Sequence, residues 1–269
     1  MKPIQFTKAV ATGNDFVIID NRSGNAGSLS TLAKKLCDRR KAIGADGLLV
    51  IEPSKKADFK MRIFNPDGSE AEMCGNGSRC AALFAASKKI AKNKMTIETL
   101  AGTLDADVKD DIVKVKLTDP KDIKWNFCLM INKCPYKVNF VDTGVPHVVH
   151  FTDDLEKVDV LNIGSHIRNH DEFSPEGTNA DFVKVVNRHT IKIRTYERGV
   201  EDETLACGTG AVASAIISAE AEKMASPVTV VTHGGEKIKV YFKMIGGNFR
   251  NVYLEGKAQL VYEGATNDI

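Results

Sequence analysis

The chain has 269 residues, of which 43% are hydrophobic and 27% are charged, and this composition excludes a disordered chain, a collagen-like repeat and a coiled coil. Its 37 basic and 35 acidic side chains leave a net charge of +2, which gives no reason to expect nucleic acid and favours a small-molecule partner. The length suits one large domain or two of about 130 residues.

The first ten residues lack the apolar stretch that a secretory signal requires, so we expect a cytoplasmic protein. The best apolar run, residues 211–219, has about half of the roughly 20 residues that a membrane-spanning helix needs. We therefore expect no membrane segment.

The first half of the chain is predicted to form short strands rich in valine and isoleucine, followed by a Cys-Gly-x-Gly turn at 74–77 and a helix. Residues 80–86 of this helix are small or apolar on nearly every face, which is typical of a helix surrounded by protein. Hairpins are expected over 95–117, with turns at 101–102 and 109–111.

The second half repeats this order of elements. Its Cys-Gly-x-Gly turn at 207–210 leads to an apolar helix over 211–219, and a hairpin over 228–242 turns at Gly234-Gly235. A further hairpin at 246–248 leads to the C-terminal strand.

Five pairs of segments support an internal duplication, because they occur in the same order at offsets of 131 to 135 residues. The pairs are Thr12–Val17 with Thr143–Val148, Ala45-Asp46 with Ala180-Asp181, Arg62–Asn65 with Arg194–Glu197, Glu70–Gly77 with Glu203–Gly210, and Gly102 with Gly234.

The duplication predicts an α/β (α+β) fold made of two pseudo-symmetric repeated domains, each a mixed sheet or barrel wrapped around a central helix. The first domain is expected over residues 1–120, joined by the C-terminal strand 258–269, and the second over 121–257.

The six cysteines of a chain without a secretory signal are expected to be reduced thiols rather than a disulfide framework. Cys128, Cys134, His147 and His150 superficially resemble a zinc finger, but their C-x5-C and H-x2-H spacings miss the usual ones. We therefore expect no metal.

A cysteine just before a helix and followed by Gly-x-Gly lies where free backbone N–H groups and the helix dipole favour a thiolate. The same N–H groups can hold a carboxylate. If the two copies pack about a pseudo-twofold axis, Cys74 and Cys207 can face each other across one cleft, and a thiolate and a thiol opposed across an α-carbon can invert it. The scheme requires no cofactor, and no Walker motif or complete G-x-G-x-x-G is present.

With Asn65-Pro66-Asp67-Gly68-Ser69 ahead of the first turn and Glu197-Arg198-Gly199 ahead of the second, the sequence resembles the diaminopimelate epimerases over nearly its whole length. Gly13–Phe16, Gly44–Gly47, Pro146-His147 and Gly177–Asn179 add to this resemblance. The resemblance implies interconversion of LL- and meso-diaminopimelate, for lysine and cell-wall synthesis, without pyridoxal phosphate.

The same resemblance implies the residue roles. Cys74 and Cys207 would be the acid/base pair. The amides of Gly75-Asn76 and Gly208-Thr209 would hold the reacting carboxylate, and Glu197 the reacting amine. The remaining residues are those expected to read the distal end or line the site: Asn14, Asn65, Asn179, Arg198 and His147. Val145 and Gly47 depart from residues common in the family, which bears on substrate stringency rather than on the chemistry.

Cys37, Cys80, Cys128 and Cys134 have no counterpart in the other half and are expected to be packing residues. Arg79, Asp67 and Glu70 are expected to be caps or surface charges rather than catalytic residues.

Two alternative functions and the oligomeric state stay open. Proline or glutamate racemases place two cysteines similarly, although proline racemases usually have His where this chain has Asn76. A non-enzymatic thiol switch would instead join Cys74 and Cys207 in a functional disulfide. A homodimer is compatible with the sequence but not specified by it.

Overall fold

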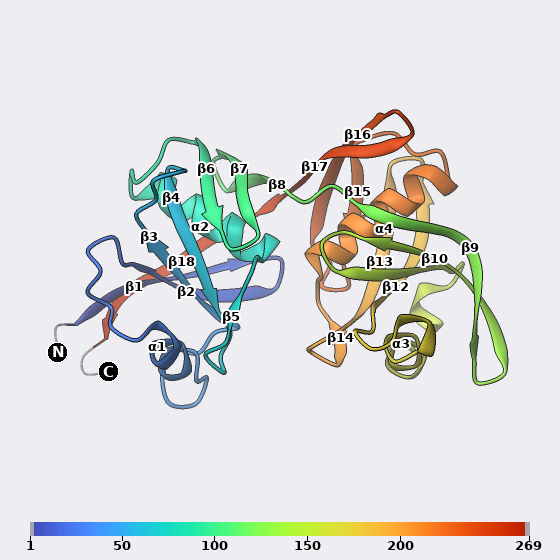
Figure 1. The fold of residues 1–269 in the computed structure, drawn as a ribbon, viewed down its shortest axis with the longest axis horizontal. Helices are drawn as coiled ribbons and strands as arrows, with labels where there is room; N and C mark the ends of the chain where they lie inside the picture. Colours follow the sequence, from blue (N-terminus) through green and yellow to red (C-terminus); the bar gives the residue numbers. More distant parts are fainter. Residues whose placement is uncertain (1–2, 267–269) are drawn as a thin grey trace. The chain divides into compact units, whose positions relative to one another are not determined.

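The computed structural model describes residues 3–266, and the chain divides into two units (Figure 1). Unit 1 contains the described residues up to 116 together with those from 256 onward, and unit 2 contains residues 117–255. Both units combine helices with a mixed sheet, so the predicted α/β class is confirmed.

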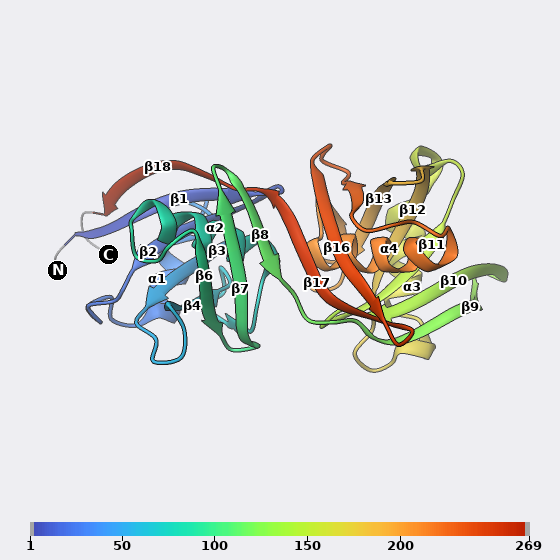
Figure 2. The same ribbon diagram turned by 90° about the horizontal axis from the view of Figure 1, so that it is seen from above.

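The strands of unit 1 come from both ends of the chain. They are β1 (Ile4–Ala11), β2 (Asn14–Asp20), β3 (Gly47–Glu52), β4 (Phe59–Phe64), β5 (Glu70–Ala71), β6 (Lys94–Thr99), β7 (Gly102–Lys109), β8 (Ile112–Lys116) and β18 (Gln259–Thr266). The pairing runs β18–β1–β2–β3–β4–β6–β7–β8, in which β2–β3 and β4–β6 are parallel and the other pairs antiparallel. Figure 2 shows β18 running beside β1.

The strands of unit 2 are consecutive in the chain. They are β9 (Lys121–Ile131), β10 (Cys134–Asp142), β11 (Pro146–Phe151), β12 (Asn179–Asn187), β13 (Thr190–Glu197), β14 (Asp202–Thr204), β15 (Val228–Val231), β16 (Lys237–Ile245) and β17 (Asn248–Lys257). Their order, β9–β10–β11–β12–β13–β15–β16–β17, has its parallel pairs at the same places, β11–β12 and β13–β15. The two units therefore have one topology.

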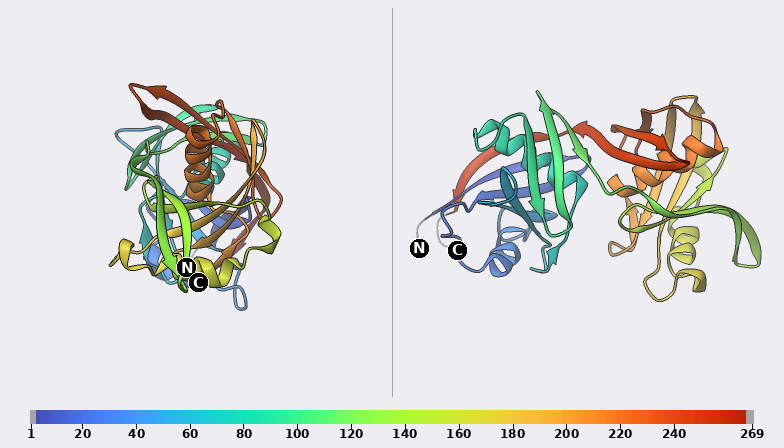
Figure 3. Two further views of the ribbon diagram at one scale, coloured as in Figure 1. Left: turned by 90° about the vertical axis from the view of Figure 1, so that its right-hand side faces the viewer. Right: turned by 45° about the horizontal axis from the view of Figure 1, so that its top comes forward.

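Each sheet curves around a helix that follows a cysteine. α2 (Gly75–Ser87) packs against strands β1 to β4, β7, β8 and β18, and α4 (Gly208–Ala221) against β10 to β13, β15 and β16. Every residue of α4 from 210 to 219 is buried, as the lack of a polar face in the sequence indicates. Figure 3 shows α4 end-on among the strands of its unit.

The strand register corrects one pair of the predicted repeat. Leu48 lies opposite Phe64 in unit 1, and Ala180 lies opposite Tyr196 in unit 2. Ala180-Asp181 therefore corresponds to Leu48-Leu49, at an offset of 132, and not to Ala45-Asp46. A shared Ala-Asp dipeptide misled the sequence comparison, because in unit 1 it lies in the loop before β3.

Two further helices lie outside the sheets and were not predicted. α1 (Leu29–Leu36) lies between β2 and β3, and α3 (Val160–Arg168) between β11 and β12, together with the short helices η1 (Leu155–Lys157) and η2 (Asp171–Phe173). Parallel neighbours need a crossover connection, which explains why both units carry a helix at this place. Apolar side chains of α1 and α3 pack on the adjoining strands in two clusters.

The close approach of α3 to β13 depends on Gly164. A Cβ atom added to Gly164 would lie 2.5 Å from Cβ of Tyr196. We expect Gly164→Val to lower the free energy of unfolding by about 2 kcal/mol or more, because neither backbone can move away without disrupting the cluster. Denaturant unfolding measures this. Leu161→Ala, an exposed position of the same helix, is the control, and an equal loss there would contradict the explanation.

Candidate active site

Each of the two repeat cysteines is the N-cap of a central helix. Cys74 precedes α2 and Cys207 precedes α4, both with extended backbone angles. The Cys74 Sγ accepts a hydrogen bond from the backbone N–H of Gly77 at 3.4 Å, and the Cys207 Sγ accepts one from Gly210 at 3.4 Å. Both sulfurs therefore lie at the positive end of a buried helix, among the first-turn N–H groups that have no partner within the helix.

Glycine at the third helical position of both turns lets the helix lie directly on a strand there. A Cβ atom on Gly77 would lie 3.1 Å from Cδ2 of Leu49 on β3. A Cβ atom on Gly210 would overlap Oδ1 of Asp181 on β12. The second glycine of each Cys-Gly-x-Gly motif thus permits the close packing that fixes the cysteine.

Cys207 is buried, with 5% of its surface exposed, whereas Cys74 is half-buried. Burial raises the pKa of the Cys207 thiol well above its usual value, and the carboxylates of Glu197 and Asp181 raise it further. Hydrogen bonds with Thr209 and Gly210 lower this pKa by less.

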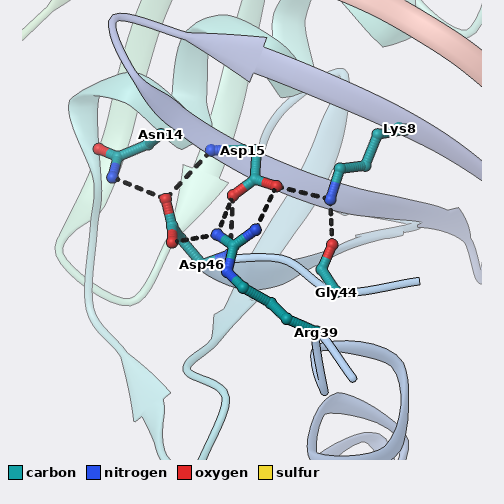
Figure 4. Close-up of polar contacts among 6 residues, drawn as sticks. All are labelled: Lys8, Asn14, Asp15, Arg39, Gly44 and Asp46. Atoms are coloured by element: carbon teal, nitrogen blue, oxygen red, sulfur yellow. Dashed lines mark hydrogen bonds and ion pairs between the residues drawn. The ribbon is translucent and has the colours of Figure 1, made fainter. Parts of the chain in front are cut away.

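In unit 1, Asn14 and Asn76 form a pair beside the first turn of α2. The Nδ2 of Asn76 donates to Oδ1 of Asn14 at 2.5 Å, and the Nδ2 of Asn14 donates to Asp46 at 3.1 Å (Figure 4). These contacts fix which way the Asn14 amide faces. The structure thus brings Asn14, Asn76, Gly75 and Cys74 together.

Asp46, which accepts the hydrogen bond from Asn14, belongs to a group of four charged side chains. Arg39 donates to both Asp15 and Asp46, and Lys8 forms an ion pair with Asp15 at 2.7 Å (Figure 4). Burial alone would raise the pKa of Asp15, but the hydrogen bonds and charges of Arg39 and Lys8 lower it to about 2.

Asn65 lies in the turn that follows β4. Its Nδ2 donates to Oγ of Ser69 at 3.0 Å, and its side chain is exposed. The contacts described for Asn65 belong to the turn of residues 65–69.

In unit 2, Asn179, Arg198 and His147 lie on neighbouring strand ends. Oδ1 of Asn179 accepts the backbone N–H of Arg198 at 2.8 Å, and Nη1 of Arg198 donates to the carbonyl of Glu176 at 3.0 Å. His147 and Asn179 lie opposite each other in the parallel β11–β12 pair. Glu197 ends β13 immediately before Arg198.

His147 is fully buried, and its Nδ1 lies 2.7 Å from Oδ2 of Asp181. The other oxygen of Asp181 accepts a hydrogen bond from Oγ1 of Thr195, also at 2.7 Å. Asp181 and Thr195 entered the sequence comparison only as members of repeat pairs, and no site role was predicted for them, because a buried Asp within an apolar strand has no local signature.

Comparison with known proteins decides the family. The sequence matches the diaminopimelate epimerase family over residues 6–122 and 139–261, which takes in both units. This chain belongs to that family. It is 43% identical to the diaminopimelate epimerase of Aquifex aeolicus, with 98% of each chain covered, and 40% identical to that of Flavobacterium psychrophilum, with 95% of this chain and 97% of the relative covered.

Solved structures show the same fold at low sequence identity. A PhzF-family phenazine biosynthesis protein from Bacillus anthracis has a TM-score of 0.78 at 18% identity, with both chains fully covered. A probable proline racemase from Agrobacterium radiobacter K84 has a TM-score of 0.69 at 15% identity, covering 98% of this chain and 93% of that one.

This member of the epimerase family repeats an ion pair beside each cysteine. Arg62 on β4 binds the carboxylate of Glu70 through two hydrogen bonds of 2.7 Å. Arg194 on β13 binds Glu203 in the same way, at 2.6 and 2.7 Å. Glu70 and Glu203 each lie four residues before a cysteine. Glu70 is an exposed charge, as predicted, and its ion pair with Arg62 also joins the segment before Cys74 to β4.

Two other expectations are wrong. Arg79 is not a surface charge: it is fully buried in α2 and donates to Thr12 and Asn76, because the helix is enclosed on all sides. Cys128 and Cys134 are exposed, since they lie on the β9–β10 hairpin, whereas Cys37 and Cys80 are buried as expected. Asp67 accepts hydrogen bonds from Ser69 within its turn, as a capping role predicts.

No helix in the described part of the chain is both long and apolar enough to cross a membrane. Among residues 3–266, no group of three or more His, Cys, Asp or Glu side chains is arranged to hold a metal ion.

The ion pairs of Asp15 with Lys8 and Arg39 predict that the stability of the fold depends on pH in the acid range. Because the pKa of Asp15 is lowered in the folded state, its contribution is present above pH 4 and is lost as the pH falls from about 4 to 2. We expect Asp15→Asn to lower the free energy of unfolding near pH 7 by about 2 kcal/mol, and the difference from the wild type to shrink over that window. Urea unfolding at several pH values measures it. Asp153→Asn, at an exposed site, is the control, and a pH-independent loss in Asp15→Asn would contradict this account.

Proposed function

We propose that this protein is a cofactor-independent epimerase that interconverts LL- and meso-2,6-diaminopimelate. The observation that carries the proposal is the pair of cysteine N-caps, one in each topologically identical unit, in a chain of the diaminopimelate epimerase family. The family relatives support the substrate, since those of Aquifex aeolicus and Flavobacterium psychrophilum bear this name.

In the proposed reaction, the thiolate of one cysteine removes the α-proton and the thiol of the other returns a proton on the opposite face. The C–H bond breaks toward one sulfur, its electron pair delocalises into the substrate carboxylate, and a new C–H bond forms from the second S–H. After one turnover the two sulfurs have exchanged protonation states. Burial and the nearby carboxylates of Glu197 and Asp181 raise the pKa of the Cys207 thiol, which favours its protonated form.

The proposed site for the reacting carboxylate is the first turns of the two helices. Backbone N–H groups of Gly75-Asn76 and Gly208-Thr209 lie at the starts of α2 and α4, where donors lack helical partners and the dipole favours negative charge. Such preorganised donors stabilise the charge that develops when the proton leaves, and this is commonly the largest catalytic contribution.

Polar side chains of both units would recognise the rest of the substrate. Glu197 would bind the reacting ammonium group. The residues proposed for the distal amino-acid end are Asn14, Asn65, Asn179 and Arg198. Asn14 and Asn179 are already held by Asp46 and by the carbonyl of Pro146, so their amide groups are oriented before substrate binds. Preorganisation of this kind reduces the entropy lost on binding.

The free thiols support action in a reducing compartment, and we propose the cytoplasm as its location. A homodimer is proposed as the assembly to test first, by light scattering at micromolar concentration.

Incubation with LL-diaminopimelate in D2O tests the proposed reaction. We expect the reduced protein to convert LL to meso isomer and to place deuterium at the α-carbon. Cys74→Ala and Cys207→Ala are each expected to lower this rate by at least about 1,000-fold, because each removes one proton carrier. Chiral chromatography and mass spectrometry follow the two products.

Cys134→Ala, which removes an exposed thiol of the β9–β10 hairpin, is the matched control and should keep wild-type activity. Deuterium exchange into proline or glutamate, with none into diaminopimelate, would reassign the substrate and keep the mechanism. An absence of exchange into any amino acid by the reduced protein would overturn the epimerase proposal.

A further inference from the structure

Corresponding positions beneath the first turns of α2 and α4 have opposite chemistry. In unit 1, a Cβ atom on Gly77 would contact Leu49 and Phe16. In unit 2, a Cβ atom on Gly210 would contact Asp181 and Thr195. The strand register makes Leu49 the counterpart of Asp181, since Leu49 lies opposite Ile63 and Asp181 lies opposite Thr195.

The same register makes Phe16 the counterpart of His147, because they face Gly47 and Asn179 in the equivalent parallel strand pairs. Unit 1 thus fills the space beneath its helix with three apolar side chains, Phe16, Leu49 and Ile63. Unit 2 fills it with His147, Asp181 and Thr195. Packing alone is satisfied by the apolar set, so the polar set in unit 2 calls for another explanation.

The hydrogen bonds of the polar set determine where the histidine proton lies. All three of these side chains are buried. The two carboxylate oxygens of Asp181 lie 2.7 Å from Nδ1 of His147 and 2.7 Å from Oγ1 of Thr195. A carboxylate only accepts, so both neighbours donate to it: Nδ1 of His147 carries a hydrogen, and an imidazole with a single hydrogen carries it there.

The Nε2 of His147 is then a hydrogen-bond acceptor. It is buried and has no hydrogen-bond partner within residues 3–266. A buried polar atom left without a partner costs about 1–3 kcal/mol, and a donor that arrives with a ligand removes that cost.

We propose that Asp181 is a positioning residue that holds His147 in its Nδ1–H tautomer, so that Nε2 accepts a hydrogen bond from a donor that arrives with the substrate. An ionised diamino acid carries hydrogen-bond donors only on its two ammonium groups, which makes an ammonium N–H the matching group. This inference rests on the proposed function and adds a tautomer requirement that acts through one unit only.

The experiment combines kinetics with nitrogen NMR of the ¹⁵N-histidine-labelled protein. In the wild type near pH 8, the His147 signals should show a protonated Nδ1 and an unprotonated Nε2, and their absence from His147→Gln assigns them. Asp181→Asn replaces an acceptor by an amide that can donate to Nδ1, so the hydrogen should move to Nε2. We expect KM to rise and kcat/KM to fall about 100-fold or more, because the wrong tautomer presents a donor to the ammonium group where an acceptor is needed.

Thr195→Val is the matched control. It removes the other hydrogen bond of Asp181 but keeps the carboxylate, so His147 should keep the Nδ1–H tautomer and kcat/KM should stay within about fivefold of the wild type. If Asp181 had only a structural role, both variants would have a lower free energy of unfolding, and His147 would keep its wild-type tautomer in both.

A wild-type His147 protonated on Nε2 and not on Nδ1 would overturn the proposal, and this measurement needs no variant to fold. A wild-type kcat/KM in Asp181→Asn, despite a moved proton, would overturn it as well. A wild-type protein that does not epimerise diaminopimelate would refute the proposed function, while the tautomer comparison would still decide the role of Asp181.

Discussion

The hydrogen bond from a first-turn N–H to a cysteine sulfur fixes the geometry on which the rest of each unit is built. It forms because the sulfur of an N-cap residue lies over the open end of its helix, and because glycine at the third position lets that helix touch the strand below. A larger residue at Gly77 or Gly210 would lift the helix from the sheet. The packing of the helix on its curved sheet therefore also places the cysteine sulfur, and it does so in the same way in both units.

What differs between the two copies is as informative as what they share. Cys74 is half-buried above a layer of apolar side chains, whereas Cys207 is buried above Asp181 and near Glu197. Two carboxylates near one sulfur oppose its ionisation. A duplicated framework thus holds two thiols in chemically distinct surroundings.

Periodic and repeated features of the fold could be predicted from the sequence, and isolated ones could not. The buried helices were evident from their uninterrupted small and apolar residues, and the two Cys-Gly-x-Gly turns aligned without gaps. α1 and α3 were missed because a crossover between parallel strands is a requirement of sheet topology, which short amphipathic segments do not reveal. The contact of buried Arg79 with Thr12, that of His147 with Asp181 and that of Arg39 with Asp15 join residues 24 to 67 positions apart, for which one sequence carries no signal.

The return of β18 to the edge of unit 1 has a consequence for how the protein is made. Unit 2 has all of its strands once residue 257 has been synthesised, although it is second in the chain. Unit 1 must wait for residues 259–266 before β1 gains its outer neighbour and α2 is fully covered. On the ribosome, the first unit to emerge is thus completed after the second, and its open strand edge is exposed to chaperones until β18 emerges.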